Sequence, residues 1–159
     1  MKGTVVFDFD DTLADTAAFK RELEVAADQK EVVMRMPEFV FPGSEALLRR
    51  LKAEGWTLAL LTFGDRDWQT AKVTRSGLLP YFDHVIYTSE PKTARAAECL
   101  TWPAPLVFVN DHGGELDALE ALIPGAKMVA LRGHKQLPTS AAAVLCEDLE
   151  GVYEAVARV

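Results

Sequence analysis

Short apolar runs alternate along the chain with longer stretches that mix apolar and polar residues. The runs with the length of strands are Thr4–Phe9, Trp56–Thr62, Asp83–Thr88, Leu106–Asn110 and Lys127–Leu131. Two segments within them, Leu58–Leu61 and Leu106–Val109, are apolar at every position. Continuous apolar runs of this length are typical of strands covered on both faces, as in a parallel sheet with helices on each side.

The stretches between these runs have the apolar spacing of helices. We predict helices at Ser44–Glu54, Arg66–Ser76, Thr93–Leu100, Glu115–Leu122 and Asp148–Ala157. The first of them places Leu47, Leu48 and Leu51 on one face and ends at Gly55. Strands that alternate with helices predict an α/β fold, specifically a doubly wound three-layer sandwich around a mainly parallel five-stranded sheet.

Residues 14–40 depart from this alternation. They follow the first predicted strand directly and are mostly helical in pattern, with Phe19, Leu23 and Ala26 forming a weak apolar face. We therefore predict one domain over residues 1–159, with residues 14–40 as a small helical cap insertion. The insertion either covers the crevice at the carboxyl ends of the strands as a lid or packs on the sheet.

Composition and charge exclude several classes of partner. The chain has 159 residues with a net charge of −7, which argues against general binding of nucleic-acid polymers or of anionic membranes. The apolar run Val5–Phe7 is too short for a signal peptide, and no run approaches the length of a membrane span. Cys99 and Cys146 fit no metal-binding spacing, so we expect reduced thiols in a cytoplasmic protein.

Two aspartates follow the first predicted strand, at the sheet edge where the chemistry of such folds is found. Strand alternation directs Asp8 and Asp10 to the same side. Two carboxylates this close repel unless a cation or a proton lies between them, and Mg²⁺ typically binds one or two carboxylates together with a phosphate. Asp11 is better explained as a cap of the following helix.

The next two strands are followed by residues suited to binding a phosphate. Thr62 offers a hydroxyl at a strand end, and Phe63 and Gly64 bring backbone amides close to it. Lys92 lies at a helix start, where a cation opposes the helix dipole unless an anion binds nearby. Taken singly, these features are also explained by an ordinary turn and a surface lysine.

The fourth predicted strand ends at another acid, Asp111, with Glu115 one helical turn further on. Asp117 is the alternative second acid. His112 lies beside these acids, where it either has a catalytic role or is an exposed loop residue.

Four ordered motifs, each at the end of a predicted strand, point to one family. They are Asp8, Asp10 and Thr12; Thr62; Lys92; and Asp111 with Glu115. In this order they resemble the haloacid dehalogenase (HAD) superfamily of aspartate-dependent phosphohydrolases. The resemblance spans nearly the whole chain except the insertion.

The resemblance implies roles for these residues. Asp8 would be the nucleophile that forms an aspartyl-phosphate, and Asp10 would be the general acid and then the general base. Thr62 and Lys92 would complete the catalytic set, with Phe63 and Gly64 binding the substrate. The implied Mg²⁺ ligands are the Asp8 side chain, the Asp10 backbone carbonyl and Asp111, with Glu115 in support.

Within the superfamily, an acid two residues after the nucleophile is similar to phosphatases and phosphomutases and absent from dehalogenases. We therefore expect a Mg²⁺-dependent phosphatase acting on a small-molecule or protein phosphomonoester. The alternatives are a phosphotransferase or phosphomutase, or a regulatory module that binds phosphate or metal without turnover. The short gap from Asp8 to Thr62 excludes a large cap and leaves the substrate open, and the sequence does not decide between a monomer and a homo-oligomer.

Overall fold

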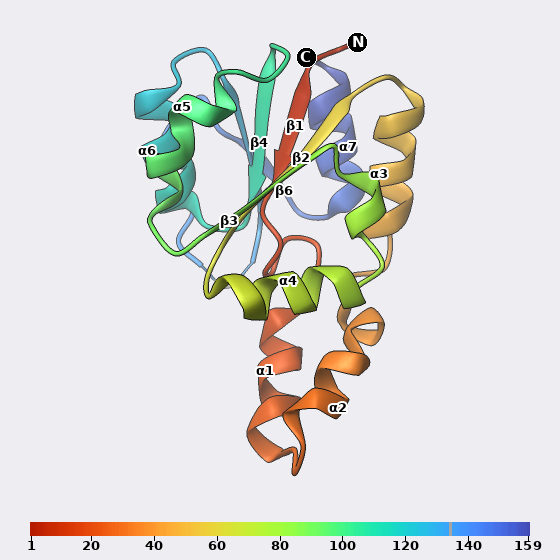
Figure 1. Cartoon of the computed structure of the whole chain (residues 1–159). Coiled ribbons are helices and arrows are strands. Elements are labelled where there is room, and N and C mark those ends of the chain that lie inside the picture. Colours follow the sequence, from red (N-terminus) through yellow and green to blue (C-terminus); the bar gives the residue numbers. More distant parts are fainter. Residues whose placement is uncertain (134) are drawn as a thin grey trace.

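A computed structural model describes residues 1–133 and 135–159. Its centre is a single sheet (Figure 1). The strands are β1 (Thr4–Phe7), β2 (Thr57–Phe63), β3 (His84–Thr88), β4 (Leu106–Asn110), β5 (Lys127–Leu131) and β6 (Val144–Cys146). They lie in the order β3-β2-β1-β4-β5-β6, and every neighbouring pair is parallel. The predicted α/β fold with a parallel sheet is confirmed.

The sheet has six strands, so the prediction of five was wrong by one. The strand that was missed, β6, has only three residues and lies at the sheet edge beside β5. Its central residue, Leu145, is 47% exposed, so β6 lacks the continuous apolar run that identified the other strands.

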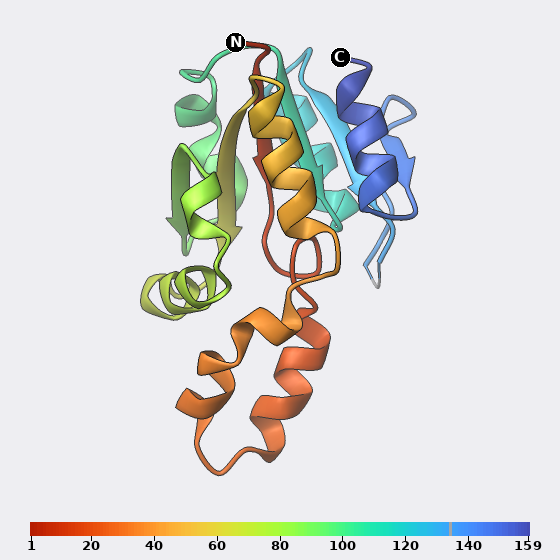
Figure 2. The ribbon, with the colours of Figure 1, turned by 90° about the vertical axis from the view of Figure 1, so that its right-hand side faces the viewer.

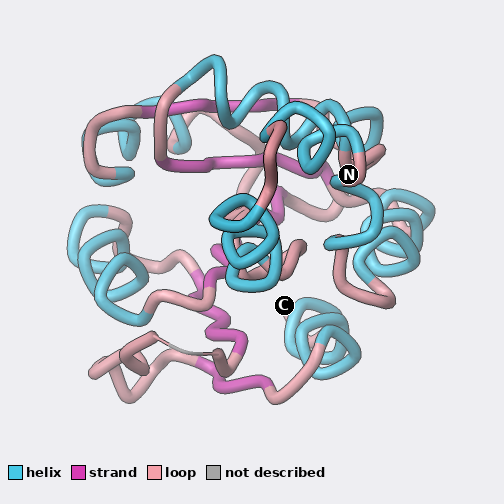
Figure 3. Tube along the Cα trace, turned by 90° about the horizontal axis from the view of Figure 1, so that it is seen from below, coloured by secondary structure: helices cyan, strands magenta, loops and turns pink. Residues whose placement is uncertain are grey.

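Helices cover both faces of the sheet, which completes the three layers (Figures 1 and 3). The helices outside residues 14–40 are α3 (Ser44–Ala53), α4 (Arg66–Arg75), α5 (Ala96–Cys99), α6 (Gly113–Leu122) and α7 (Leu149–Ala157). α3 and α7 lie on one face, and α5 and α6 lie on the other (Figure 1). The same part of the chain also contains two short 3-10 helices, η2 (Leu79–Tyr81) and η3 (Lys92–Arg95). The helix predicted over Thr93–Leu100 is therefore divided between η3 and α5.

The core forms two layers because side chains alternate along each strand. In β1, Val5 and Phe7 pack with Leu48 of α3, whereas Val6 packs with Leu116 of α6. All five side chains are 1% exposed or less. Burial on both faces of β1 explains why its sequence is continuously apolar.

Residues 14–40, which we call the cap segment, project beyond the carboxyl ends of the strands (Figures 1 and 2). The segment contains α1 (Thr16–Val25), α2 (Gln29–Met34) and η1 (Met36–Phe39). Asp15 caps α1 by accepting a hydrogen bond from the Ala18 amide at 2.9 Å. A bridge between Ala14 and Val40 closes the base of the segment.

The cap segment packs against α4 rather than lying free. The Phe19 ring of α1 lies 5.4 Å from that of Phe39 and 6.1 Å from that of Trp68 on α4, centroid to centroid.

Among the described residues, no helix is long and apolar enough to cross a bilayer.

Candidate active site

A tight turn after β1 places the first motif at the carboxyl edge of the sheet. Asp11 adopts the left-handed backbone conformation, with φ of 58°, at the centre of this turn. Its carboxylate accepts a hydrogen bond from the Ala17 amide at 3.2 Å, so Asp11 caps the first turn of α1 as expected. The Leu13 amide donates back to the Phe9 carbonyl at 2.9 Å, which closes the turn with Asp8 just before it and Asp10 within it.

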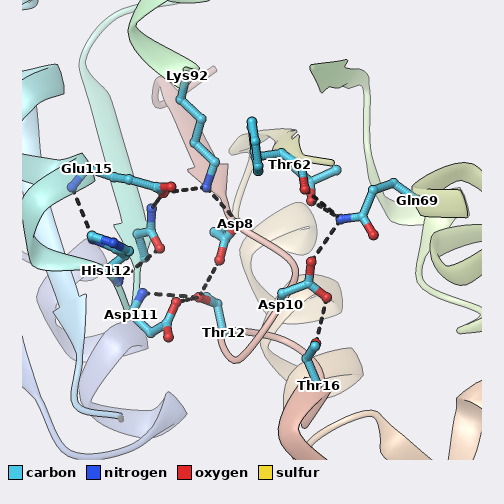
Figure 4. Close-up of polar contacts among 12 residues, drawn as sticks. Asp8, Asp10, Thr12, Thr16, Thr62, Gln69, Lys92, Asp111, His112 and Glu115 are labelled. Carbon is cyan, nitrogen blue, oxygen red and sulfur yellow. Dashed lines mark hydrogen bonds and ion pairs between the residues drawn. The ribbon is translucent and has the colours of Figure 1, made fainter. Parts of the chain in front are cut away.

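Asp8 forms a buried ion pair with Lys92 (Figure 4). The Lys92 Nζ lies 2.7 Å from Asp8 Oδ1 and 2.7 Å from Glu115 Oε2. Burial lowers the pKa of Lys92, but Asp8 and Glu115 outweigh it and hold the pKa above its ordinary value. Asn110 also donates to Glu115 Oε2 at 2.6 Å, so Glu115 is held by two donors that both come from the carboxyl side of the sheet. Glu115 therefore fixes Lys92 beside Asp8.

Asp8 and Asp111 approach each other through Thr12. The Thr12 hydroxyl lies 3.2 Å from Asp8 Oδ2 and 3.4 Å from Asp111 Oδ1, and it accepts a hydrogen bond from the Asp111 amide (Figure 4). Burial raises the pKa of Asp8, although Lys92 opposes this. Burial and the neighbouring Asp8 raise the pKa of Asp111 to about 6. Asp111 Oδ2 is buried without a hydrogen-bond partner, and the half-exposed ammonium of Lys135 lies 3.7 Å from it.

Asp10 faces away from this pair, towards α4 and the cap segment. Its Oδ1 accepts from the Thr16 hydroxyl at 2.5 Å and pairs with the ammonium of Lys72. Its Oδ2 accepts from Gln69 Nε2 at 2.8 Å (Figure 4). Burial raises the pKa of Asp10, but Lys72 with the hydrogen bonds from Thr16 and Gln69 holds it below its ordinary value.

The second motif lies next to Asp10. The Thr62 hydroxyl is fully buried and accepts a hydrogen bond from Gln69 Nε2 at 2.8 Å. The Gly64 amide donates to the Thr88 carbonyl at 2.9 Å and is therefore already bonded within the protein. The Phe63 side chain is 51% exposed and lines the cleft that contains Asp8.

The structure places the two candidate second acids of the fourth motif, Glu115 and Asp117, in different surroundings. Asp117 turns away from the site and accepts hydrogen bonds from the amides of Thr139 and Ser140, at 2.9 and 3.1 Å. Glu115 is the acid that reaches Lys92. His112 caps α6, with its Nδ1 accepting from the Glu115 amide at 3.3 Å, so its ring supports the helix that carries Glu115.

These groups surround one cleft of about 340 Å³ at the base of the cap segment. Asp8, Asp10 and Lys92 line its interior, and Lys20 and Trp68 are exposed lining residues from α1 and α4. The cleft therefore brings together the predicted residues of the first and third motifs with side chains of the cap segment.

A divalent cation fits beside Asp8 and Asp111. Among the described residues, no group of three or more His, Cys, Asp or Glu side chains is arranged to hold a metal. Mg²⁺ does not require such a group, since it usually binds one or two carboxylates and keeps water or phosphate as its other ligands. Asp111 Oδ2 has no hydrogen-bond partner, and its ion pair with the half-exposed Lys135 is long, at 3.7 Å. The pKa values of both carboxyls stay raised despite Lys92 and Lys135, so a further positive charge would stabilise the two carboxylates. Glu115 contacts Lys92 instead of this pair.

Comparison with known proteins identifies the family. The family model described as haloacid dehalogenase-like hydrolase matches residues 18–129. The chain therefore belongs to the haloacid dehalogenase-like hydrolases, as the four motifs indicated. The matched range contains Thr62, Lys92, Asp111 and Glu115 and begins after Asp8 and Asp10.

A curated relative is a phosphoglycolate phosphatase of Cereibacter sphaeroides (strain ATCC 17025 / ATH 2.4.3). It is 29% identical over 107 residues, which cover 62% of this chain and 48% of the relative. A phosphoglycolate phosphatase from Cereibacter sphaeroides strain ATCC 17029 / ATH 2.4.9 matches over the same shares. The chain thus spans about half the length of the curated relatives it matches.

Solved structures share the fold at low sequence identity. A HAD phosphatase from Thermococcus onnurineus superposes with a TM-score of 0.72 at 20% identity, covering 98% of each chain. The L-2-haloacid dehalogenase from Xanthobacter autotrophicus gives 0.72 at 16% identity, covering 99% of each chain. Since a phosphatase and a dehalogenase match equally well, the fold alone does not distinguish their reactions.

Gln69 and Lys72 were not found by sequence reasoning. They lie three residues apart on α4, where Gln69, Lys72 and Val73 are the buried residues. The signal was that the predicted helix over 66–76 lacks an apolar stripe, so polar side chains had to occupy its buried face.

Proposed function

We propose that this protein hydrolyses phosphomonoesters through an aspartyl-phosphate on Asp8, with Mg²⁺ as cofactor. The observation that carries the proposal is the position of Asp8, with one oxygen bound to the buried Lys92 and the other next to Asp111, at the interior of the cleft. A carboxylate in this position is accessible to a substrate and has a cation beside it for the transferring phosphoryl group.

In the first step an Asp8 oxygen attacks phosphorus while the bond from phosphorus to the leaving oxygen breaks. The negative charge of the bound phosphoester favours the protonated form of Asp10, against the effect of Lys72. Asp10 gives this proton to the leaving oxygen, so an alcohol departs. In the second step a water gives a proton to Asp10 and its oxygen attacks phosphorus, which releases inorganic phosphate and restores the Asp8 carboxylate. Lys92 neutralises the transferring oxygens in both steps.

Asp8, Asp111 and the backbone carbonyl of Asp10 would hold Mg²⁺. When bound, Mg²⁺ supplies positive charge that offsets repulsion between a carboxylate nucleophile and a phosphate dianion. Glu115 keeps Lys92 directed at Asp8, and Thr62 fixes Gln69 behind Asp10.

Asp10 favours a phosphatase over a dehalogenase on chemical grounds. An alkoxide leaving group needs a proton, whereas a halide leaves without one, so an acid in the cleft is required only for phosphoester cleavage. The relatives named phosphoglycolate phosphatase support a small phosphorylated metabolite as substrate, and residues 14–40 act as its cap within one domain. The expected location remains the cytoplasm.

The test is phosphate release from a panel of phosphomonoesters, with Mg²⁺ or with a chelator, by the parent protein and by Asp8→Asn. We expect release that requires both Mg²⁺ and Asp8. The matched control is Asp117→Asn, which alters an aspartate of α6 that, among the described residues, bonds Thr139 and Ser140 and no residue of the cleft. Equal release by the parent and Asp8→Asn would refute the proposal.

A further inference from the structure

The helix α4 buries a lysine and a glutamine next to Asp10. Lys72 is 3% exposed and Gln69 is 2% exposed. Long polar side chains are seldom buried unless they are paired. Lys72 pairs with Asp10 and donates to Gln69 Oε1 at 3.1 Å, which accounts for its burial. Among the described residues, neither side chain forms a hydrogen bond or an ion pair with Asp8 or Lys92, so neither directly contacts the nucleophile or its lysine.

Two aromatic rings also lie close to the Lys72 ammonium. The Lys72 Nζ lies over the rings of Phe9 and Phe19, at 5.7 and 5.4 Å from their centroids. Aromatic faces attract a cation at such distances, so both rings help to hold the ammonium in place. Phe19 belongs to α1, so the cap segment contributes to this position.

Gln69 is itself fixed by the second motif. Its Nε2 has two N–H groups and three acceptors within reach, Thr62 Oγ1 at 2.8 Å, Asp10 Oδ2 at 2.8 Å and the Phe63 carbonyl at 3.1 Å. The end of β2 therefore sets the place of Gln69, and Gln69 helps to set the places of Lys72 and Asp10.

Stability alone does not explain this arrangement, because a buried ion pair is often no more stabilising than apolar side chains of similar volume. What the arrangement does supply is direction. Both oxygens of Asp10 are bonded: Lys72 of α4 and Thr16 of α1 contact Oδ1, and Gln69 of α4 donates to Oδ2.

We propose that Lys72, fixed by Gln69, is the positioning residue for Asp10 and orients its carboxyl towards the leaving-group oxygen of the substrate. This rests on the proposed function and adds the residues that make Asp10 effective. A proton donor displaced by even a small distance transfers its proton poorly, so loss of Lys72 slows the cleavage step that depends on that proton.

The choice of substrate separates positioning from general damage. An alkyl phosphate needs a proton on its leaving oxygen, whereas p-nitrophenyl phosphate releases a stabilised phenolate and needs little help from Asp10. The experiment measures the single-turnover rate of phosphoryl transfer to Asp8 from each ester, in the presence of Mg²⁺. The variants are Lys72→Met, Lys72→Arg and the milder Gln69→Met, which keeps the ion pair.

We expect Lys72→Met to slow transfer from the alkyl ester by at least about tenfold more than transfer from the aryl ester. Lys72→Arg restores most of the difference because it keeps the cation, and Gln69→Met shows the same pattern with a smaller effect. The matched control is Lys52→Met, which removes a lysine from an exposed ion pair with Asp83 and leaves both rates unchanged.

Equal slowing with both esters, or no slowing with either, in folded Lys72→Met and Gln69→Met would overturn the positioning role and leave the proposed function intact. If the parent protein transfers no phosphoryl group to Asp8 from either ester, the proposed function fails and this role fails with it. Melting curves of each variant identify any that do not fold. If Lys72→Met does not fold, the comparison of the two esters with Gln69→Met tests the positioning role.

Discussion

Replacing Asp111 with asparagine removes a buried charge that lacks a hydrogen-bond partner on one oxygen, and we expect the metal-free protein to become more stable at neutral pH. Burial and the nearby Asp8 raise the pKa of Asp111 from its ordinary value of 3.8 to about 6, although Lys135, 3.7 Å from Oδ2, opposes this. An acid with a raised pKa binds more protons in the folded state than in the unfolded state. Stability therefore falls as the pH rises from about 4 to about 6 and stays lower above that range.

The size of the effect follows from the two pKa values. A difference between 3.8 and about 6 corresponds to about 3 kcal/mol at most, at roughly 1.4 kcal/mol for each pH unit. Because Asp111 and Asp8 share their interaction, we expect Asp111→Asn to gain about 1–3 kcal/mol in the free energy of unfolding in chelator. The gain should disappear below about pH 4, where the Asp111 carboxyl is protonated in both states.

The assay is urea unfolding of both proteins in chelator, at neutral pH and at acid pH, repeated with Mg²⁺. Mg²⁺ should stabilise the parent by binding its folded state and should stabilise Asp111→Asn much less. The control is Asp117→Asn on the same helix, which should respond to Mg²⁺ as the parent does. If Asp111→Asn is no more stable than the parent in chelator at neutral pH, or gains as much from Mg²⁺, the assignment of Asp111 to the metal site is wrong.

Three further changes test other parts of the account. Leu48→Ala, at a fully buried position between α3 and the sheet, should lower the free energy of unfolding by about 3 kcal/mol in a urea titration. Asp83→Asn should lower stability by less than about 1 kcal/mol at neutral pH, since burial raises the pKa of Asp83 but Lys52 and the Leu58 amide hold it below its ordinary value. This loss should shrink as the pH falls through that lowered pKa, and a constant loss across the titration would contradict the ion pair. Phe63→Ala should raise the KM for aryl phosphates severalfold more than the KM for small alkyl phosphates, because the half-exposed ring lines the cleft. If the KM changes equally for both kinds of ester, Phe63 does not contribute to substrate binding.

Burial made most of the fold predictable. Strands covered on both faces, such as β1 and β4, must be apolar throughout, and helices between them must carry an apolar stripe, as α3 does with Leu47, Leu48 and Leu51. The edge strand β6 was not predicted, because it is short and partly exposed and therefore has no continuous apolar run.

The site was predictable where it follows strand ends. Parallel strands bring their carboxyl ends to one edge, so Asp8 and Asp111 are neighbours although they lie 103 positions apart in the sequence. Contacts that depend on how a helix is rotated against the sheet left no such trace. The orientation of α4 brings Lys72 to Asp10, and the position of the first turn of α6 brings Glu115 to Lys92.

Backbone hydrogen bonding was equally hidden from the sequence. The Gly64 amide was expected to face the substrate, but it donates to the Thr88 carbonyl at the end of β3. At the end of β2, the side chain of Phe63 remains half exposed and lines the cleft.

The most direct test of the central claim is to locate the phosphoryl group after a single turnover. The protein with Mg²⁺ is mixed with a phosphomonoester, quenched in acid and digested, and its peptides are analysed by mass spectrometry. We predict a transient phosphoryl group on Asp8, absent in chelator and absent from Asp8→Asn, that decays as inorganic phosphate appears. Mg²⁺-dependent phosphate release with no phosphoryl group on Asp8 at any time, or one that persists without release, would contradict the proposed catalytic cycle.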